Sequence, residues 1–446
     1  MKAEEKLRNV AVLGAAGKMG SGITMLTALE MASQSVLPQN RGQQYILYAI
    51  DVNNENLAGL LKYIESQALK YAEKNTVYLR KVYADRADLV ENEEIIREYV
   101  KHVLSIVRPV NRIENAASVN LVFEAASENP ELKVQLFRQI EKVNPHKPWY
   151  LTNTSSIPIS WLEKEAGLEG RLIGFHFYNP PAVQKLIEII PSAGTSAELR
   201  EFALEFAQTL KKVIVFSNDK AGFIGNGHFM RDILFATSQV EKLTAKGMPE
   251  TQAIYLLNKV SHELLVRPMG IFQLVDYVGI DVCQYIMKVM NPHYPNEKLH
   301  SDLLDRMLAV GVKGGQYPDG SQKDGFFKYE KGRIVGIFDL NSRSYLSVDE
   351  LENAVRQWGA PWPEGAPQWK TAIKISDASN TLKPYFDSLK GHASAAARLA
   401  IEYGRASRDI ARALVSTGVA LSEEDVNTVL KTGFYHVYGP VNAYFD

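Results

Sequence analysis

Cysteine is almost absent from this chain, because Cys283 is the only one among its 446 residues. A single thiol cannot form an intramolecular disulfide and cannot build a cysteine-based metal site. Such scarcity is typical of proteins from a reducing compartment. We therefore expect no disulfide, no bound metal and a cytoplasmic location.

An excess of charge of either sign is also missing. The chain has 50 Lys and Arg against 51 Asp and Glu, a formal net charge of -1. Nucleic-acid binding needs a basic excess or stripe, so we expect no nucleic-acid partner. A local basic patch that binds a small phosphorylated ligand is compatible with this balanced charge. No apolar run approaches the ~20 residues that span a membrane, and residues 1–9 lack the apolar stretch of a signal peptide. We expect no membrane partner.

The first half of the chain alternates short apolar runs with helical stretches. Such alternation predicts a mostly parallel sheet with helices on both faces. A helix is expected from Lys18 to about Ser33, and two helices, as a protruding hairpin, between Glu55 and about Val107. The expected strands are 9–13, 45–50, 120–125, 149–152, 172–175 and 213–216.

Helical periodicity dominates after about Asp219, so we expect a domain boundary near 217–221 and an all-α C-terminal half. Within it, the stretches 231–270 and 408–440 look alike. Each predicts a helix, a turn, a second helix, a Gly/Pro stop and an aromatic helix. Two interpretations stay open, an internal duplication and a chance likeness of two helical hairpins.

A glycine-rich loop separates the first expected strand from the first expected helix. Gly14 allows a tight turn, and Gly20 lets the helix pack close to the sheet, while the helix N-terminus offers free N–H groups to a phosphate. The spacing G-x-x-G-x-x-G is one residue longer than the usual dinucleotide motif, and an ordinary strand-to-helix turn is the alternative. The expected cofactor contacts are Gly14, Ala16, Gly17, Lys18, Met19 and Gly20.

Asp51 ends the second expected strand. An acid there would accept hydrogen bonds from the adenosine ribose and repel a 2′-phosphate, which favours NAD over NADP. It lies 31 residues after Gly20, and the polar stretch 34–44 accounts for the excess over the usual ~20 as an insertion. A solvated Asp that starts a turn is the alternative.

Four residues are of the types that alcohol oxidation needs. A histidine suits the base that takes the hydroxyl proton, because its ordinary pKa is ~6.5. A carboxylate on the other ring nitrogen sets the tautomer, and a Ser hydroxyl and an Asn amide can hold the substrate oxygen. His176, Glu188, Ser155 and Asn226 match these types. Spacing alone does not bring them together, and a lone His at a strand end is more often structural.

The segments around these residues resemble the 3-hydroxyacyl-CoA dehydrogenase family of fatty-acid β-oxidation. That family carries Asn-Thr-Ser-Ser, His-Phe-Phe-Asn-Pro, Lys-Leu-Val-Glu and Pro-Gly-Phe-Ile-x-Asn in this order. The corresponding segments here are 153–156, 176–180, 185–188 and 221–226. The resemblance implies that His176 is the base, Glu188 its partner, and Ser155 and Asn226 the groups that bind the substrate oxygen.

Further residues follow from the same resemblance, which covers about residues 8–330. The segment 123–129 matches the family around a glutamate near the nicotinamide, and the helical-domain signature falls on 267–279. The stretch 394–446 resembles the second helical repeat of longer members. The implied cofactor contacts, beyond the loop and Asp51, are Glu128, Lys133, Asn153 and Asn179.

The chain also departs from the family pattern. The cofactor loop has its extra residue, Lys220-Ala221 replaces the usual Thr-Pro, and Gly227 replaces a common Arg. The chain between the second expected strand and Asn120 is long, so CoA contacts are hard to transfer from the family. Ser66 and Lys74, on the helix after Asp51, are the candidates, and a plain solvated helix face is the alternative.

Together these observations predict an α/β, Rossmann-type NAD-binding domain (1–218), a helical dehydrogenase domain (219–345) and a second, similar helical domain (346–446). The expected reaction is oxidation of (S)-3-hydroxyacyl-CoA to 3-oxoacyl-CoA with NAD. Two alternatives remain, an NAD-dependent dehydrogenase of a small hydroxy acid without CoA and a non-enzymatic NAD-binding scaffold. The family implies a homodimer, but a duplicated half could bury the same surface within a monomer.

Overall fold

The computed structural model describes residues 3–317, 320–375 and 377–446. The chain divides into two compact units, Met1–Asp219 and Lys220–Asp446. This division falls within the stretch where the sequence pattern changes from alternating strands and helices to helices. Each unit has its own hydrophobic core.

An eight-stranded sheet forms the centre of the N-terminal unit, with strand order β3-β2-β1-β4-β5-β6-β7-β8. Neighbouring strands from β3 to β6 are parallel, whereas β7 runs antiparallel to β6 and parallel to β8. The strand order reverses between β1 and β4, and the carboxyl ends of parallel strands form a ligand crevice at such a point. The strands are β1 (Asn9–Leu13), β2 (Ile46–Ile50), β3 (Val107–Val110), β4 (Leu121–Glu124), β5 (Trp149–Thr152), β6 (Leu172–Phe177), β7 (Leu186–Pro191) and β8 (Val213–Phe216).

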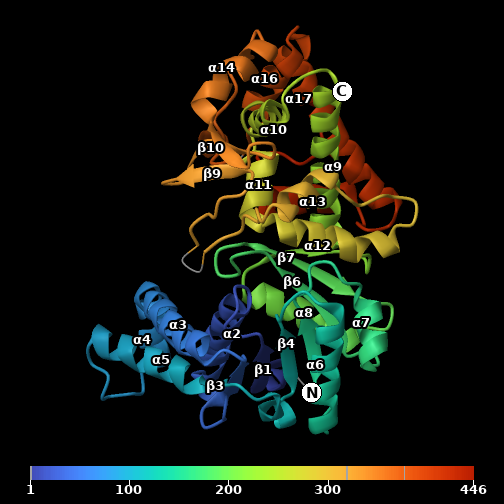
Figure 1. Ribbon diagram of the computed structural model, residues 1–446. Helices are drawn as coiled ribbons and strands as arrows, with labels where there is room; N and C mark the ends of the chain where they lie inside the picture. Colours follow the sequence, from blue (N-terminus) through green and yellow to red (C-terminus); the bar gives the residue numbers. More distant parts are fainter. Residues whose placement is uncertain (1–2, 318–319, 376) are drawn as a thin grey trace. The chain divides into compact units, whose positions relative to one another are not determined.

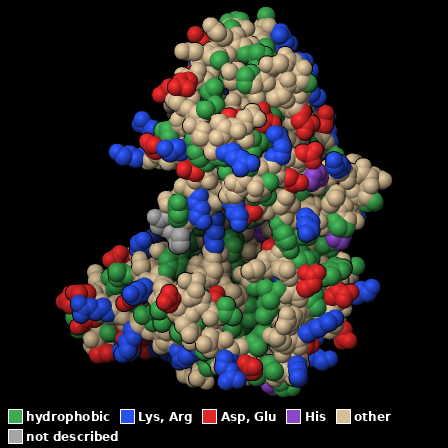
Figure 2. Space-filling view, viewed as in Figure 1, with side chains coloured by type: hydrophobic (Ala, Val, Ile, Leu, Met, Phe, Trp, Pro, Cys, Tyr) green, Lys and Arg blue, Asp and Glu red, His purple; other side chains and the backbone are tan. Residues whose placement is uncertain are grey.

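Helices connect and cover these strands, and three of them project from the sheet as an arm (Figure 1). The helices of the unit are α1 (Ala3–Lys6), α2 (Gly20–Ser35), α3 (Asn54–Lys74), α4 (Thr76–Val82), α5 (Asn92–Ile106), α6 (Pro130–Val143), α7 (Ile159–Ala166) and α8 (Ala197–Thr209). The arm consists of α3, α4 and α5, and acidic and basic side chains mix at its end (Figure 2).

The prediction of two helices in the arm was wrong in number. The structure has three, and the residues after α5 form the edge strand β3. Pro109 explains this change, because proline has no N–H to continue a helix but is tolerated on an edge strand.

The C-terminal unit is mainly helical. Its helices are α9 (Phe223–Ala245), α10 (Glu250–Lys259), α11 (Ile271–Val278), α12 (Ile280–Met290), α13 (Asp302–Ala309), α14 (Val348–Trp358), α15 (Trp369–Ala372), α16 (Ser379–Gly391), α17 (Ala395–Ser416) and α18 (Glu423–Gly433). The all-α prediction was wrong in one respect, because β9 (Phe327–Glu330), β10 (Arg333–Asp339) and β11 (Ser344–Ser347) form an antiparallel sheet. Ile337 of β10 is fully buried, and α10 and α14 pack against that strand. Packing of one apolar face onto helices stabilises such short strands.

The two similar stretches form the helix pairs α9–α10 and α17–α18, and α9 packs against α17. They differ at their ends. Helix α11 follows Gly270, but bends and turns follow Gly439-Pro440, so the second aromatic helix was a wrong prediction. Phe445 instead packs on α17, where a Cβ on Gly404 would lie 2.4 Å from its ring. Residue 345, where the sequence predicts a boundary between two helical domains, lies within β11, and a single hydrophobic core includes residues on both sides of it. The division at this residue stays a prediction.

Candidate active site

The glycine loop lies between β1 and α2 and is tightly packed. Gly14 adopts φ +70, and the N–H of Gly17 donates to its carbonyl at 3.0 Å, which closes a turn. A Cβ on Gly20 would lie 1.9 Å from the same carbonyl oxygen, so only glycine fits there. Met19 is the N-cap of α2 and makes no side-chain cap bond. The extra residue is therefore accommodated as a turn that leaves Gly14 and Gly20 in direct contact.

Asp51 lies at the end of β2, beside this loop. Its Oδ2 accepts a hydrogen bond from the N–H of Ala16 at 3.0 Å, and its Oδ1 accepts one from Asn53 at 3.1 Å. The carboxylate is thereby oriented by the backbone at the position where the nucleotide-binding motif places an acid. Its contact with ribose stays a prediction.

A buried charge network occupies the ends of β4 and β5. Lys133 on α6 is 1% exposed, and its Nζ lies 2.7 Å from Glu124 Oε1 and 3.4 Å from Glu128 Oε2. Glu124 is fully buried and also accepts a hydrogen bond from the Thr152 hydroxyl at 2.6 Å. Burial would lower the pKa of Lys133, but Glu124 and Glu128 outweigh burial and raise it. Sequence reasoning missed Glu124, although a charged residue that ends an apolar strand was a signal for it.

Glu128 accepts several hydrogen bonds from the segment that carries Ser155. Its Oε1 accepts from the N–H groups of Ser155 and Ser156 at 2.8 and 3.0 Å, and from the hydroxyls of Thr154 and Ser156 at 2.7 and 2.9 Å. Burial alone would raise the pKa of Glu128, but Lys133 and these bonds hold it below its ordinary value. Glu128 therefore orders the loop after β5, and its predicted role near the nicotinamide stays untested.

His176 and Glu188 meet across the antiparallel strands β6 and β7, where they are register partners. His176 Nδ1 lies 3.2 Å from Glu188 Oε1, with His176 8% exposed and Glu188 fully buried. The same oxygen accepts the hydroxyl of Tyr178 at 2.6 Å. Burial, and then the Glu188 charge, raise the pKa of Tyr178 well above its ordinary value. The expected strand over 172–175 extends to Phe177, so His176 lies within β6.

The segment after β6 reaches towards the glycine loop. Asn153 Oδ1 accepts a hydrogen bond from the N–H of Phe177 at 2.8 Å, and Asn179 lies two residues further along the chain. A Cβ on Gly22 of α2 would lie 3.0 Å from the ring carbons of Pro181, so that ring rests on the helix. Lys212 Nζ donates to the carbonyls of Pro181 and Gln184 at 2.6 Å each, and burial lowers its pKa to about 8. Lys212 thus clamps this segment, a role that sequence reasoning missed.

The remaining predicted site residues lie elsewhere. Ser66 and Lys74 are exposed on α3 of the arm, which is compatible with CoA binding and with a solvated helix face. Asn226 belongs to the C-terminal unit and lies in the first turn of α9, after Gly222 at φ +82. Their roles stay predictions.

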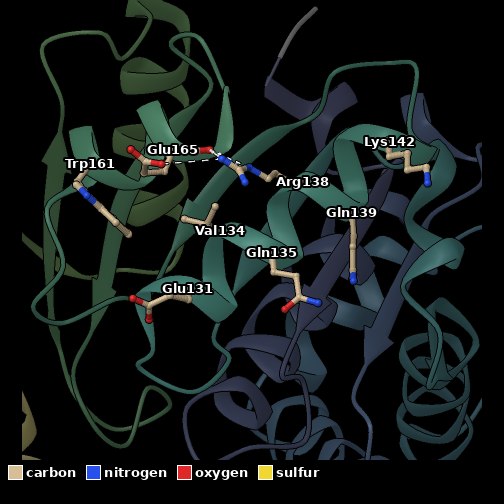
Figure 3. Close-up of a pocket in the computed structure, with 8 residues that line it drawn as sticks. All are labelled: Glu131, Val134, Gln135, Arg138, Gln139, Lys142, Trp161 and Glu165. Atoms are coloured by element: carbon tan, nitrogen blue, oxygen red, sulfur yellow. Dashed lines mark hydrogen bonds and ion pairs between the residues drawn. The ribbon is translucent and has the colours of Figure 1, made fainter.

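A groove of about 480 Å³ lies between α6 and α7 on the N-terminal unit (Figure 3). Trp161 and Glu165 come from α7, and Gln135 and Arg138 from α6. The Arg138 guanidinium donates to the Glu165 carbonyl at 2.9 Å through Nε. The predicted site residues do not line this groove, and we assign it no role.

Comparison with known proteins identifies the family. The model of the 3-hydroxyacyl-CoA dehydrogenase NAD-binding domain matches residues 9–220, and that of the C-terminal domain matches 254–329. A probable 3-hydroxyacyl-CoA dehydrogenase of Caenorhabditis elegans is 30% identical over 332 residues, which are 74% of this chain and 98% of that protein. The chain belongs to the 3-hydroxyacyl-CoA dehydrogenase family. The prediction from the sequence that the chain is an NAD-dependent 3-hydroxyacyl-CoA dehydrogenase is thereby confirmed.

Other relatives agree. A probable 3-hydroxybutyryl-CoA dehydrogenase of Bacillus subtilis is 29% identical over 73% of this chain and 99% of its own length. The crystal structure of 3-hydroxybutyryl-CoA dehydrogenase from Escherichia coli is 21% identical, with a TM-score of 0.63 over 98% of this chain and 90% of that one. The shared fold therefore continues past residue 329, where the match to the C-terminal family model ends. Among the described residues, no helix is long and apolar enough to cross a membrane.

Proposed function

We propose that the protein oxidises (S)-3-hydroxyacyl-CoA to 3-oxoacyl-CoA, with His176 as the base that takes the hydroxyl proton. The observation that carries this proposal is the contact between His176 Nδ1 and Glu188 Oε1 at 3.2 Å. An ionised carboxylate can only accept, so Nδ1 carries a hydrogen and the lone pair is on Nε2. The base is thus held in the tautomer that can accept a proton from substrate.

The glycine loop fits NAD. A Cβ on Gly14 would lie 2.7 Å from the Ala125 carbonyl oxygen, and one on Gly20 would lie 1.9 Å from the Gly14 carbonyl oxygen, so the close packing of this loop requires both glycines. Helix α2 begins directly after the loop, and a helix N-terminus offers N–H groups to a phosphate. NAD bound at this loop would supply the acceptor for the hydride of the carbinol carbon. The hydroxyl proton passes to His176 Nε2, and Glu188 stabilises the imidazolium that results.

Two further groups are proposed to bind the substrate oxygen, Ser155 and Asn226. Support for Ser155 comes from its fixed backbone position, because its N–H donates a hydrogen bond to Glu128 Oε1 at 2.8 Å. Ser66 and Lys74 are proposed CoA contacts on the exposed face of α3. A cytoplasmic location, and a homodimer or a monomer, stay predictions that cell fractionation and sedimentation would test.

An assay of NADH consumption with acetoacetyl-CoA tests the activity, and free acetoacetate shows whether CoA is required. His176→Ala should lower kcat by about 10²–10⁴-fold, because general-base catalysis contributes that much. His146→Ala, an exposed histidine on the same unit, is the matched control. Near-normal turnover of His176→Ala would remove His176 from the proposed mechanism.

A further inference from the structure

His176 and Tyr178 both direct a donor to Glu188 Oε1, and Tyr178 lies outside the mechanism described so far. His176 Nδ1 approaches this oxygen at 3.2 Å and the Tyr178 hydroxyl at 2.6 Å. The phenol therefore makes the shorter bond to the oxygen that orients the base.

Strand geometry brings the three groups together. His176 pairs directly with Glu188 between β6 and β7, and Tyr178 follows two residues later, one residue past the end of β6. Side chains two apart on an extended strand point to the same face. The rings of His176 and Tyr178 accordingly lie 4.9 Å apart, centroid to centroid, at an angle of 42°. The family pattern quoted above has Phe where this chain has Tyr178, so a phenylalanine at this position lacks the hydroxyl.

A hydrogen bond to a carboxylate stabilises its charge and weakens its pull on a second partner. Burial raises the pKa of Tyr178 well above its ordinary value, so the phenol stays protonated and remains a donor. From β8, the residue paired with Glu188 is Val215, which carries no charge. The His176 imidazole and the Tyr178 phenol therefore compete for the same carboxylate oxygen.

We infer that Tyr178 is a positioning residue which, through Glu188, sets the pH at which His176 takes up and releases its proton. The inference rests on the proposed function, because it requires His176 to be the base. With the phenol present, the carboxylate stabilises the imidazolium less, and His176 stays neutral to lower pH.

Tyr178→Phe tests this inference, with Tyr435→Phe, a tyrosine that is 38% exposed in the C-terminal unit, as the control. Oxidation needs the neutral base, so the acid limb of its kcat/KM profile should move to higher pH by about one unit, a tenfold change in the protonation ratio. Reduction needs the protonated acid, so its alkaline limb should move upwards by the same amount. Maximal kcat should change less than about threefold, because the base itself is intact.

The inference is supported if the acid limb for oxidation and the alkaline limb for reduction both move to higher pH in Tyr178→Phe and neither moves in Tyr435→Phe. Unmoved limbs, or a uniform loss of kcat at every pH, overturn it, because a merely structural role would not shift the profile. If Tyr178→Phe is not folded by circular dichroism, Tyr178→Met takes its place under the same criteria. The wild-type assay separates the two proposals, since a wild type inactive on acetoacetyl-CoA contradicts the proposed function, and an unmoved profile contradicts only the role of Tyr178.

Discussion

Replacing Lys133 by Met separates a structural role from a cofactor contact. The sequence comparison implies that Lys133 contacts the cofactor, whereas the structure shows its Nζ 2.7 Å from Glu124 and 3.4 Å from Glu128. Lys133→Met keeps an unbranched chain of similar length and removes the charge. We expect it to destabilise the N-terminal unit, with weaker NADH binding only as a consequence.

The magnitude follows from burial. Glu124 is fully buried, so removal of its cation leaves an uncompensated charge, with Glu128 as a second anion nearby. Breaking a buried ion pair by removing one partner costs about 3–5 kcal/mol. We expect the free energy of unfolding to fall by this amount, a large part of the ~5–15 kcal/mol that stabilises a typical domain.

The loss should depend on pH in a defined direction. Lys133 and the Thr154–Ser156 segment hold the pKa of Glu128 below its ordinary value. Its stabilising contribution is therefore present above the ordinary carboxyl range and is lost as the pH falls through the folded-state pKa. The difference between wild type and Lys133→Met should shrink in acid.

Hydrogen exchange of the amides in β4 and β5 measures this loss, because these strands open only with the core of the unit. Lys142→Met, at an exposed position on the same helix, is the control and should stay within about 0.5 kcal/mol of wild type. The reasoning is refuted if Lys133→Met leaves strand protection within about 1 kcal/mol of wild type and the Kd for NADH rises at least about tenfold. Lys133 would then act on the cofactor directly.

Two other substitutions test the loop and the clamp. Gly20→Ala places a Cβ 1.9 Å from the Gly14 carbonyl oxygen and should weaken NADH binding at least about tenfold, as measured by fluorescence titration. Gly59→Ala is the control, because a Cβ there meets nothing within 4 Å, and it should bind NADH normally. The pKa of Lys212 is lowered to about 8 by burial, so the unfolded chain binds more protons above that pH. Stability of the N-terminal unit should therefore rise from about pH 8 to about pH 10 in the wild type and in Lys211→Met, but not in Lys212→Met. A Gly20→Ala protein with normal NADH affinity, or an unchanged slope in Lys212→Met, would contradict these two accounts.

Most strands of the N-terminal sheet could be predicted, because a buried parallel strand is a short apolar run between turns. The run Asn9–Leu13, for example, is β1 with the predicted bounds. β3 and β7 were missed for different reasons. β3 continues a helical pattern and ends it only at Pro109, and β7 is an apolar run whose antiparallel place beside β6 depends on the rest of the sheet. The sheet β9–β11 was missed because its strands are short and are buried mainly by helices.

The amino-acid sequence by itself determined the fold class, the family and the residue types of the site. It could do so because apolar periodicity, the glycine loop and the order of the motifs are local properties of the chain. Only the tertiary structure decided which groups share one oxygen or one cation. The register of β6 and β7 brings His176 to Glu188, and the Tyr178 hydroxyl reaches the same carboxylate from just past the end of β6. Glu128 lies 3.4 Å from Lys133 and accepts the backbone N–H of Ser155. Register and burial depend on contacts between residues far apart in the chain, which residue spacing does not specify.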